Sequence, residues 1–248
     1  MTLVPRSIAS MKKLRRLRRW FKRNVLRQPW MLEGFASPFV HEPMLLDKIR
    51  GDAYREAIQR TVKPDDVVVD LGFLKPGGRI VPESADTFLL PISSEAFGLG
   101  QLPPRFYDLD YRPLIKRLSA EYRHLRASGK PFLALSEPAL CYHVDFRKDT
   151  QNPGKTFAPF RVIAEGRLDG FLGWFEARLC EGVTLSNSPY LPLTSWWQLY
   201  LPVAEQPHYR AGQTMLLYLD PKITDGEAEW SYSVQPATPE CSASVSQK

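Results

Sequence analysis

Residues 62–82 read VKPDDVVVDLGFLKPGGRIVP, and this stretch decides what fold the sequence predicts. A proline–aspartate turn leads into Val67–Val69, a continuous apolar run that is typical of a buried parallel strand. Asp70 and Gly72 follow at once, at the carboxyl end of that strand, where open α/β sheets bind their ligands. A nucleotide-binding fold would continue with further glycines and a helix. Here the chain turns directly into another predicted strand.

The composition is that of a globular protein. Of 248 residues, 44% are hydrophobic and 24% charged, which excludes disordered, collagen-like and repeat-fibre classes. No stretch approaches the roughly 18 consecutive apolar residues of a membrane span, so we expect any membrane contact to be peripheral. The three cysteines, Cys141, Cys180 and Cys241, are far apart, which argues against a disulfide scaffold and a zinc ribbon. We therefore expect a reducing compartment and a cytoplasmic location.

The segment before the predicted strand is helical. Residues 41–60 read HEPMLLDKIRGDAYREAIQR and predict one or two helices, with Pro43 in a first turn and a break at Gly51–Asp52. An apolar face is supplied by Met44, Leu45, Ile49, Tyr54 and Ile58.

The positive charge of the chain is concentrated in residues 1–32, which hold ten Lys or Arg residues and no acid, while acids outnumber bases in the remainder. Within this arm, residues 11–28 have apolar side chains at helical spacing and predict a basic amphipathic helix, which Pro29 ends. Such a helix can lie on anionic lipid, follow nucleic-acid phosphates or target an organelle. It can equally be a solvated arm, or pack its apolar side chains on the body of the protein.

The second half of the chain predicts β structure. Alternating and apolar runs separated by Pro, Gly, Asn and Asp turns occupy residues 79–92, 131–146, 157–179, 196–203, 213–221 and 229–234. Residues 112–127 interrupt them with helical spacing. One barrel or sandwich with an inserted helix accounts for the pattern, and residues 235–248 predict a disordered polar tail.

No local motif identifies a catalytic or metal centre. The four histidines are scattered, and the motifs of metalloproteases, P-loop proteins and α/β-hydrolases are absent. Cys141 and His143 are close enough to suggest a nucleophile and base, but we expect them to be structural. Glu137 and Asp145 predict rim charges. We assign no catalytic residue and no metal ligand.

Taken in order, five segments resemble the protein arginine N-methyltransferases. They are HEPMLLDKIRGDAYREAI, VVVDLG, FLKPGGRIVPESADTFLLPI, GWFEARL and LSNSPYLPLTSWWQ, spread from about residue 35 to residue 234. The resemblance implies a fold of the α/β plus β class, in which a Rossmann-like segment precedes a β-barrel. It also implies S-adenosylmethionine as the cofactor and protein arginine as the methyl acceptor.

By the same resemblance, five residues would bind the cofactor. His41, Met44 and Arg50 match the element that packs over S-adenosylmethionine, where the arginine pairs with the methionyl carboxylate. A guanidinium suits that role because it holds a carboxylate by two parallel hydrogen bonds. Asp70 and Gly72 match the start of the first cofactor motif.

The chain departs from the family between Gly72 and Phe73. There the rest of the glycine-rich motif, the ribose-binding acid and the loop with two glutamates are all missing. Ser195 replaces the histidine of the barrel's threonine-histidine-tryptophan loop. The predicted organisation is a basic arm, a truncated Rossmann-like segment, a β-barrel domain with an inserted helix and a tail, at residues 1–32, 33–78, 79–234 and 235–248.

Three functions remain open from the sequence. The first is an active arginine methyltransferase, with a dimer partner supplying the missing parts. The second is a degenerate, non-catalytic relative that binds a protein partner. The third is a β-rich adaptor that its basic arm recruits to a membrane or to nucleic acid. The loss of the ribose and adenine contacts favours the second, because several contacts of the cofactor are removed together.

Overall fold

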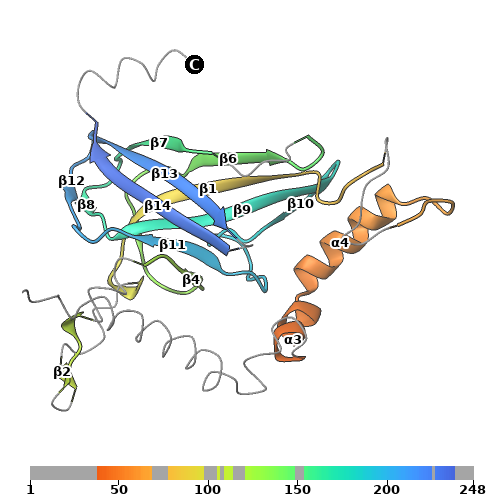
Figure 1. Ribbon diagram of the computed structural model, residues 1–248, viewed down its shortest axis with the longest axis horizontal. Helices are drawn as coiled ribbons and strands as arrows, with labels where there is room; N and C mark the ends of the chain where they lie inside the picture. The colour runs from red at the N-terminus through yellow and green to blue at the C-terminus, as the bar shows by residue number, and fades with distance from the viewer. Residues whose placement is uncertain are drawn as a thin grey trace, which may run out of the picture. The chain divides into compact units, whose positions relative to one another are not determined.

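The computed structural model describes most of the chain between residues 38 and 237 (Figure 1). The described residues are 38–68, 78–97, 105–106, 109–113, 121–148, 154–224 and 227–237. The chain divides into two compact units, residues 1–48 and residues 49–248, and each is considered by itself. The predicted amphipathic helix at residues 11–28 lies outside the described residues.

Two helices occupy the stretch for which one or two were predicted, α3 (Pro38–Leu46) and α4 (Lys48–Thr61). The expected first-turn position of Pro43 is wrong, because α3 begins at Pro38 and Pro43 lies inside it. The expected break at Gly51–Asp52 is wrong as well, since α4 runs through both residues. A glycine inside a helix costs only about 1 kcal/mol, which the packing of the helix can offset.

That packing comes from one face of α4. Ala57 is fully buried, and Ala53 and Tyr54 pack beside it against a cluster of apolar residues from the β domain. The cluster includes Leu179 and Val183. The apolar side of α4 is thus fixed by tertiary contacts rather than by helix propensity.

The strand predicted at Val67–Val69 is not formed in its described part. Val67 and Val68 lie outside any strand and are 87% and 69% exposed. A parallel strand is stable only between neighbours that pair with it. All pairs among the described strands are antiparallel and begin at Ser84 or later, so they offer no such neighbour. Asp70 and Gly72 lie outside the described residues.

The β domain follows in the order that the alternating pattern predicts. Its elements are β1 (Ser84–Ser93), η2 (Glu95–Phe97), β2 (Arg105–Phe106), β3 (Leu109–Asp110), β4 (Arg123–Leu125), β5 (Leu133–Ala134), β6 (Ala139–Asp145), β7 (Thr156–Arg161), β8 (Gly166–Arg167), β9 (Gly170–Cys180), β10 (Val183–Ser186), β11 (Gln198–Pro202), β12 (His208–Tyr209), β13 (Thr214–Thr224) and β14 (Glu227–Pro236). Because β14 extends to Pro236, the expected tail does not begin at residue 235.

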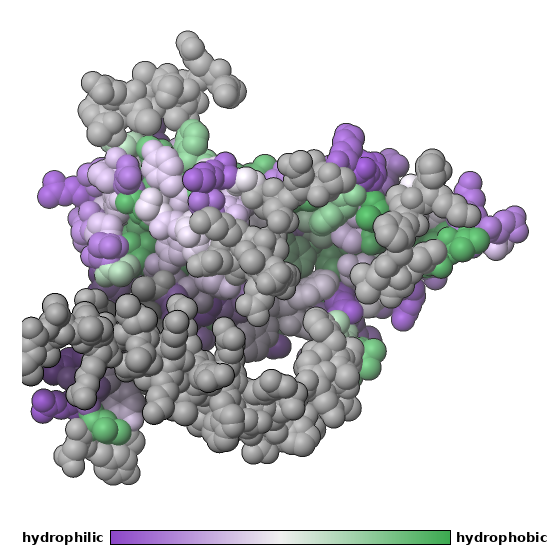
Figure 2. Space-filling view, viewed as in Figure 1, coloured by the Kyte–Doolittle hydropathy of each residue, from purple (hydrophilic) through white to green (hydrophobic). Residues whose placement is uncertain are grey.

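Two sheets dominate this domain. The larger has seven strands in the order β4-β11-β9-β1-β5, with β10 added to β9 and β6 added to β1. The smaller has the order β14-β13-β7. Figure 1 shows β13 and β14 passing across β1 and β9, and Figure 2 shows hydrophilic and apolar residues mixed on the same face of the molecule.

The main core lies where the two sheets face each other. Leu89 of β1 and Phe171 of β9 meet Phe160 of β7 and Leu217 of β13, and all four side chains are at most 1% exposed. β6 and β7 contact each other without forming a paired ladder among the described strands. The arrangement is that of two sheets around one core, and closure into the predicted barrel stays a prediction.

The helix predicted over residues 112–127 is wrong at its carboxyl end. Only Arg112 and Pro113 are helical, and residues 114–120 lie outside the described residues. Arg123–Leu125 forms β4, whose Leu125 pairs with Gln198 of β11. The spacing of leucine and tyrosine side chains that predicted a helix is also compatible with a short strand. Leu125 of this strand enters the core.

A buried carboxylate fixes the end of the larger sheet. Asp169 accepts hydrogen bonds from Ser94 N at 2.8 Å, Arg167 Nε at 2.7 Å and Gln206 Nε2 at 2.9 Å. Its backbone carbonyl accepts another from the Tyr200 hydroxyl at 2.8 Å. One residue thus links β1, β8 and β11 with the loop before β12.

Replacing this carboxylate should make the β domain less stable against unfolding. We expect Asp169→Ala to lower the free energy of unfolding by about 3 kcal/mol, because it leaves a buried amide and a guanidinium without their acceptor. Urea denaturation followed by tryptophan fluorescence measures the change. As a control, Asp110→Ala removes an exposed ion pair with Arg112 and should leave the midpoint unchanged. Equal midpoints for the two variants would show that Asp169 is not a structural junction.

Candidate functional site

The residues that the family resemblance assigns to the cofactor lie in different parts of the chain. His41 and Met44 are on α3, in the unit of residues 1–48, and Arg50 is on α4, in the unit of residues 49–248. Asp70 and Gly72 are outside the described residues. Of the five, only Arg50 can be placed against the β domain.

Arg50 contacts the loop between β10 and β11. Its guanidinium carbon lies 5.2 Å from the centroid of the Trp196 ring, and Trp196 packs edge-on against Phe175 of β9 with ring centroids 5.2 Å apart. A guanidinium over an aromatic face is attracted by the ring quadrupole. In this structure the arginine expected to hold a carboxylate therefore lies on an indole ring.

Two buried amide side chains shape that loop, residues 187–197. Asn187 accepts a hydrogen bond from Phe175 N and donates one to the carbonyl of Trp197, both at 2.8 Å. Gln198 donates to the carbonyl of Asn187 at 2.6 Å and accepts from Ala127 N at 2.9 Å. Both side chains are less than 5% exposed, so their hydrogen bonds are shielded from water.

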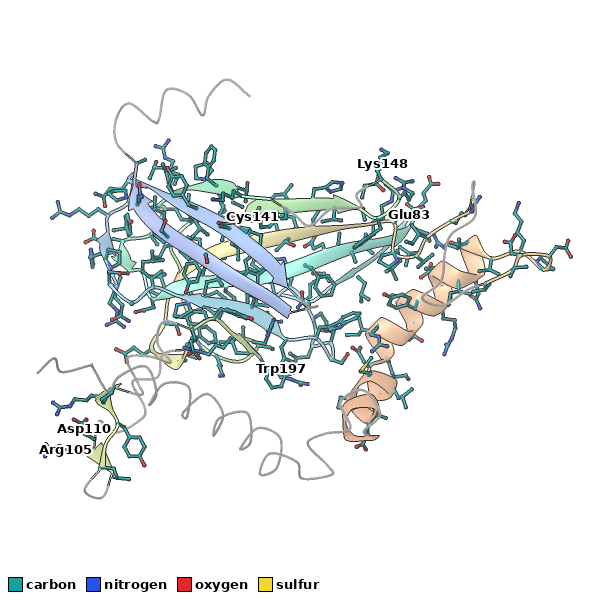
Figure 3. All side chains as sticks on the ribbon, in the orientation of Figure 1. Glu83, Arg105, Asp110, Cys141, Lys148 and Trp197 are labelled. Atoms are coloured by element: carbon teal, nitrogen blue, oxygen red, sulfur yellow. The ribbon has the colours of Figure 1, made fainter. Side chains whose placement is uncertain are left out.

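The loop places buried polar residues beside exposed apolar ones. Thr194 is buried, and its hydroxyl oxygen accepts a hydrogen bond from Trp196 N at 3.3 Å. In contrast, four large side chains of the same loop are about half exposed or more: Tyr190, Leu191, Leu193 and Trp197. Trp197, labelled in Figure 3, has the Arg126 guanidinium carbon 5.8 Å from its ring centroid. A fixed loop that exposes apolar side chains is a candidate protein-binding surface.

The described residues do not assemble the S-adenosylmethionine site that the resemblance implies. The guanidinium that would hold the methionyl carboxylate lies over Trp196, and Val67 and Val68 do not extend the strand that would carry Asp70 to the ligand. Binding at the carboxyl ends of strands requires a sheet whose strands end together at that edge. We therefore derive no reaction step through this cofactor.

The Cys141–His143 pair does not form a nucleophile and base. Cys141 is the extra residue where the β1–β6 register shifts, and its thiol is buried, which raises its pKa to about 12 and keeps it protonated at neutral pH. His143 is exposed, with Nδ1 2.6 Å from a carboxylate oxygen of Asp86. The structural interpretation of both residues agrees with this geometry.

The two acids predicted as rim charges behave as such. Glu137 is exposed, and hydrogen bonds from Arg147 hold the pKa of Asp145 well below its usual range. Within the described part of the chain, no group of three His, Cys, Asp or Glu side chains could hold a metal ion. None of the described helices is long and apolar enough to cross a membrane.

Sequence reasoning missed the residues that build the loop and the sheet junction. Asn187 and Gln198 belong to motifs noted for their resemblance, but nothing local indicates that their amides meet. Asp169 stands in a stretch assigned to a strand, where a polar residue suggests an outward position. The turn-forming sequence Asn187-Ser188-Pro189 was the one local signal that a tight turn begins at Asn187.

No model of a known protein family matches the sequence. The structure matches the Trypanosoma brucei PRMT1 enzyme-prozyme heterotetrameric complex with AdoHcy, with a TM-score of 0.59 and 15% identity, over 67% of this chain and 55% of that one. The arrangement of helices followed by a β domain is therefore similar in fold to that complex.

Two relatives identified by sequence support the same family. The chain is 28% identical to an arginine N(omega)-methyltransferase of Streptomyces achromogenes subsp. streptozoticus over 59% of its length. It is 25% identical to the histone-arginine methyltransferase CARMER of Drosophila yakuba over 58% of its length. The chain is therefore similar in sequence to protein arginine N-methyltransferases. The matches span 40% and 30% of the length of these two relatives.

The loop between β10 and β11 should lose its order without its amides. We expect Asn187→Ala to destabilise the protein by about 2 kcal/mol, since it leaves a buried N–H and a buried carbonyl unpaired. Hydrogen–deuterium exchange of Phe175 and of residues 187–197 measures the local effect. As a matched control, Gln213→Ala removes an exposed amide that caps one turn and should leave this exchange unchanged. Unaltered protection in Asn187→Ala would contradict the role given to the amide.

Proposed function

We propose that this chain is a non-catalytic member of the arginine methyltransferase family that acts through protein contacts of its β domain. One observation carries the proposal. Val67 and Val68, which begin the strand expected to end at the cofactor, are exposed and unpaired in the described structure. Without that strand, the described residues offer no strand end at which S-adenosylmethionine could bind.

The sequence supports the loss of catalysis independently. Arginine stays protonated, so methylation requires acidic groups that align its guanidinium toward the methyl donor. The loop with two glutamates that does this in the family has no counterpart here, because Gly72 is followed directly by Phe73. The family's loop histidine is also replaced, by Ser195.

The loop of residues 187–197 supports a binding role. Its exposed apolar side chains are held in place by Asn187 and Gln198, so little conformational entropy is lost when a partner covers them. The structural neighbour is a heterotetrameric enzyme-prozyme complex. By analogy, we propose a protein partner of the same family, a second copy of this chain or another member, and a cytoplasmic location.

The proposal predicts that the folded chain does not bind the cofactor. We expect isothermal titration with S-adenosylmethionine and with S-adenosylhomocysteine to give no heat of binding, because the carboxylate clamp and the strand edge are not in place. The full-length Streptomyces relative is the positive control. Circular dichroism verifies that the titrated chain is folded.

A methyl-transfer assay tests directly whether the chain is catalytic. If the chain transferred labelled methyl groups to an arginine-rich peptide and Arg50→Ala abolished the transfer, the chain would be an active enzyme. A matched control, Arg55→Ala, removes an exposed arginine of the same helix. Micromolar cofactor binding would likewise overturn the proposal.

A second role is favoured by the ten basic residues of the arm, residues 1–32. We propose that the arm brings the β domain to a phosphate-bearing surface, a membrane or a nucleic acid, by charge attraction. The arm lies outside the described residues, so this proposal rests on the sequence alone.

Removing the arm tests the charge mechanism. A variant lacking residues 1–32 should lose binding both to vesicles containing phosphatidylserine and to duplex DNA. For nucleic acid, the affinity of the full chain should fall steeply with salt, because bound counterions are released on association. Co-sedimentation measures binding to the vesicles, and fluorescence anisotropy measures binding to the DNA, each at 50 and 200 mM salt. Binding that persists at high salt, or after removal of the arm, would contradict recruitment by charge attraction.

A further inference from the structure

A cleft of about 780 Å³ lies on the β domain, away from the loop of residues 187–197. It is lined by the carboxyl end of α4, the residues that lead into β1, the turn after β6 and the β9–β10 hairpin. Figure 3 labels Glu83, which lines the cleft, and Lys148 of the neighbouring turn at the same end of the sheet. The volume is in the range of pockets that hold small molecules.

Four arginines from four separate segments line this cleft: Arg60, Arg79, Arg147 and Arg178. Two glutamates, Glu83 and Glu181, also line it, so the wall carries more positive than negative charge. Arg60, Arg147 and Arg178 are each about half exposed, which leaves their guanidinium groups accessible to a solute.

Arg60 is anchored at the hairpin turn. Its Nη1 donates to the carbonyl of Glu181 at 3.2 Å, and its Nη2 pairs with Glu56 one turn earlier on α4. Gly182 follows with φ of +73°, and a Cβ there would lie 3.0 Å from Arg60 Nη1. The absence of a side chain at residue 182 therefore lets the guanidinium approach the turn.

The other arginines retain donors that their ion pairs do not use. Arg178 contacts Glu83 through Nε at 3.2 Å, which leaves its two terminal nitrogens. Arg147 uses Nε and Nη2 on Asp145, which leaves Nη1. Arg79 forms no ion pair with a carboxylate of the described residues. The carboxylates thus orient guanidinium groups whose remaining N–H donors can meet a ligand.

We propose that this cleft binds the phosphate group of a small phosphorylated molecule. Several guanidinium groups converging from different segments suit a doubly charged, tetrahedral anion with three or more acceptor oxygens. The cleft exceeds the size of one phosphate, which leaves room for the rest of the molecule. The site shares no lining residue with Arg50 or the loop of residues 187–197, so it does not depend on the non-catalytic function proposed above.

Isothermal titration of the full chain with inorganic pyrophosphate and with glycerol 2-phosphate tests the site. We expect one-to-one binding of both, and at least a tenfold loss of affinity in the double variant Arg79→Ala/Arg178→Ala, since hydrogen bonds between charged groups are removed. The matched control, Arg112→Ala/Arg161→Ala, removes the same charge from exposed arginines that do not line the cleft. It should bind as the unaltered chain does.

The design separates the cleft from the basic arm. All the variants keep residues 1–32, so any binding by the arm contributes equally to each titration. Thermal melting verifies that each variant is folded, and Arg79→Ala alone, which breaks no described ion pair, provides a mild second variant. No binding of either phosphate compound, equal binding by the cleft variants, or equally tight binding of citrate would overturn the proposal.

Discussion

Asp169 is the point at which the β domain is held together. Its carboxylate receives donors from the end of β1, from β8 and from the loop before β12, while its carbonyl receives the hydroxyl of Tyr200. Taking a carboxylate out of water is costly unless all its lone pairs find donors, and here at least three do. The junction therefore fixes how the ends of β1, β8 and β11 lie beside one another.

The same principle explains the loop between β10 and β11. Asn187 and Gln198 lie in a place where water does not reach, so each hydrogen bond they make prevents an orphaned backbone group. Their amides connect the loop to β9 and to Ala127, two residues after β4, and the loop cannot move without breaking these hydrogen bonds. The apolar side chains that the loop exposes are consequently presented in one arrangement.

The strands could be predicted from the sequence, whereas these junctions could not. Apolar runs and alternation between turn residues located β1, β6, β9, β11, β13 and β14; β9 and β11 are buried along most of their length. Asp169 meets Ser94 across 75 residues, and no local pattern reveals such a partner. The apolar run at Val67–Val69 misled for the opposite reason. Its local pattern is that of a buried strand, but none of the described strands pairs with it, and Val67 and Val68 are exposed.

The core of the β domain does not depend on the segment at Val67–Val69. The largest fully buried side chains, among them Tyr200, Phe160 and Phe171, all come from the strands of this domain and the turns between them. α4 remains attached to that domain because Ala57 is buried in it and Arg60 is bonded to the hairpin. The same segment also carries Ile58, Val67 and Val68, whose side chains are 51%, 87% and 69% exposed. Since the hydrophobic effect favours covering such side chains, they are suited to contact with another protein.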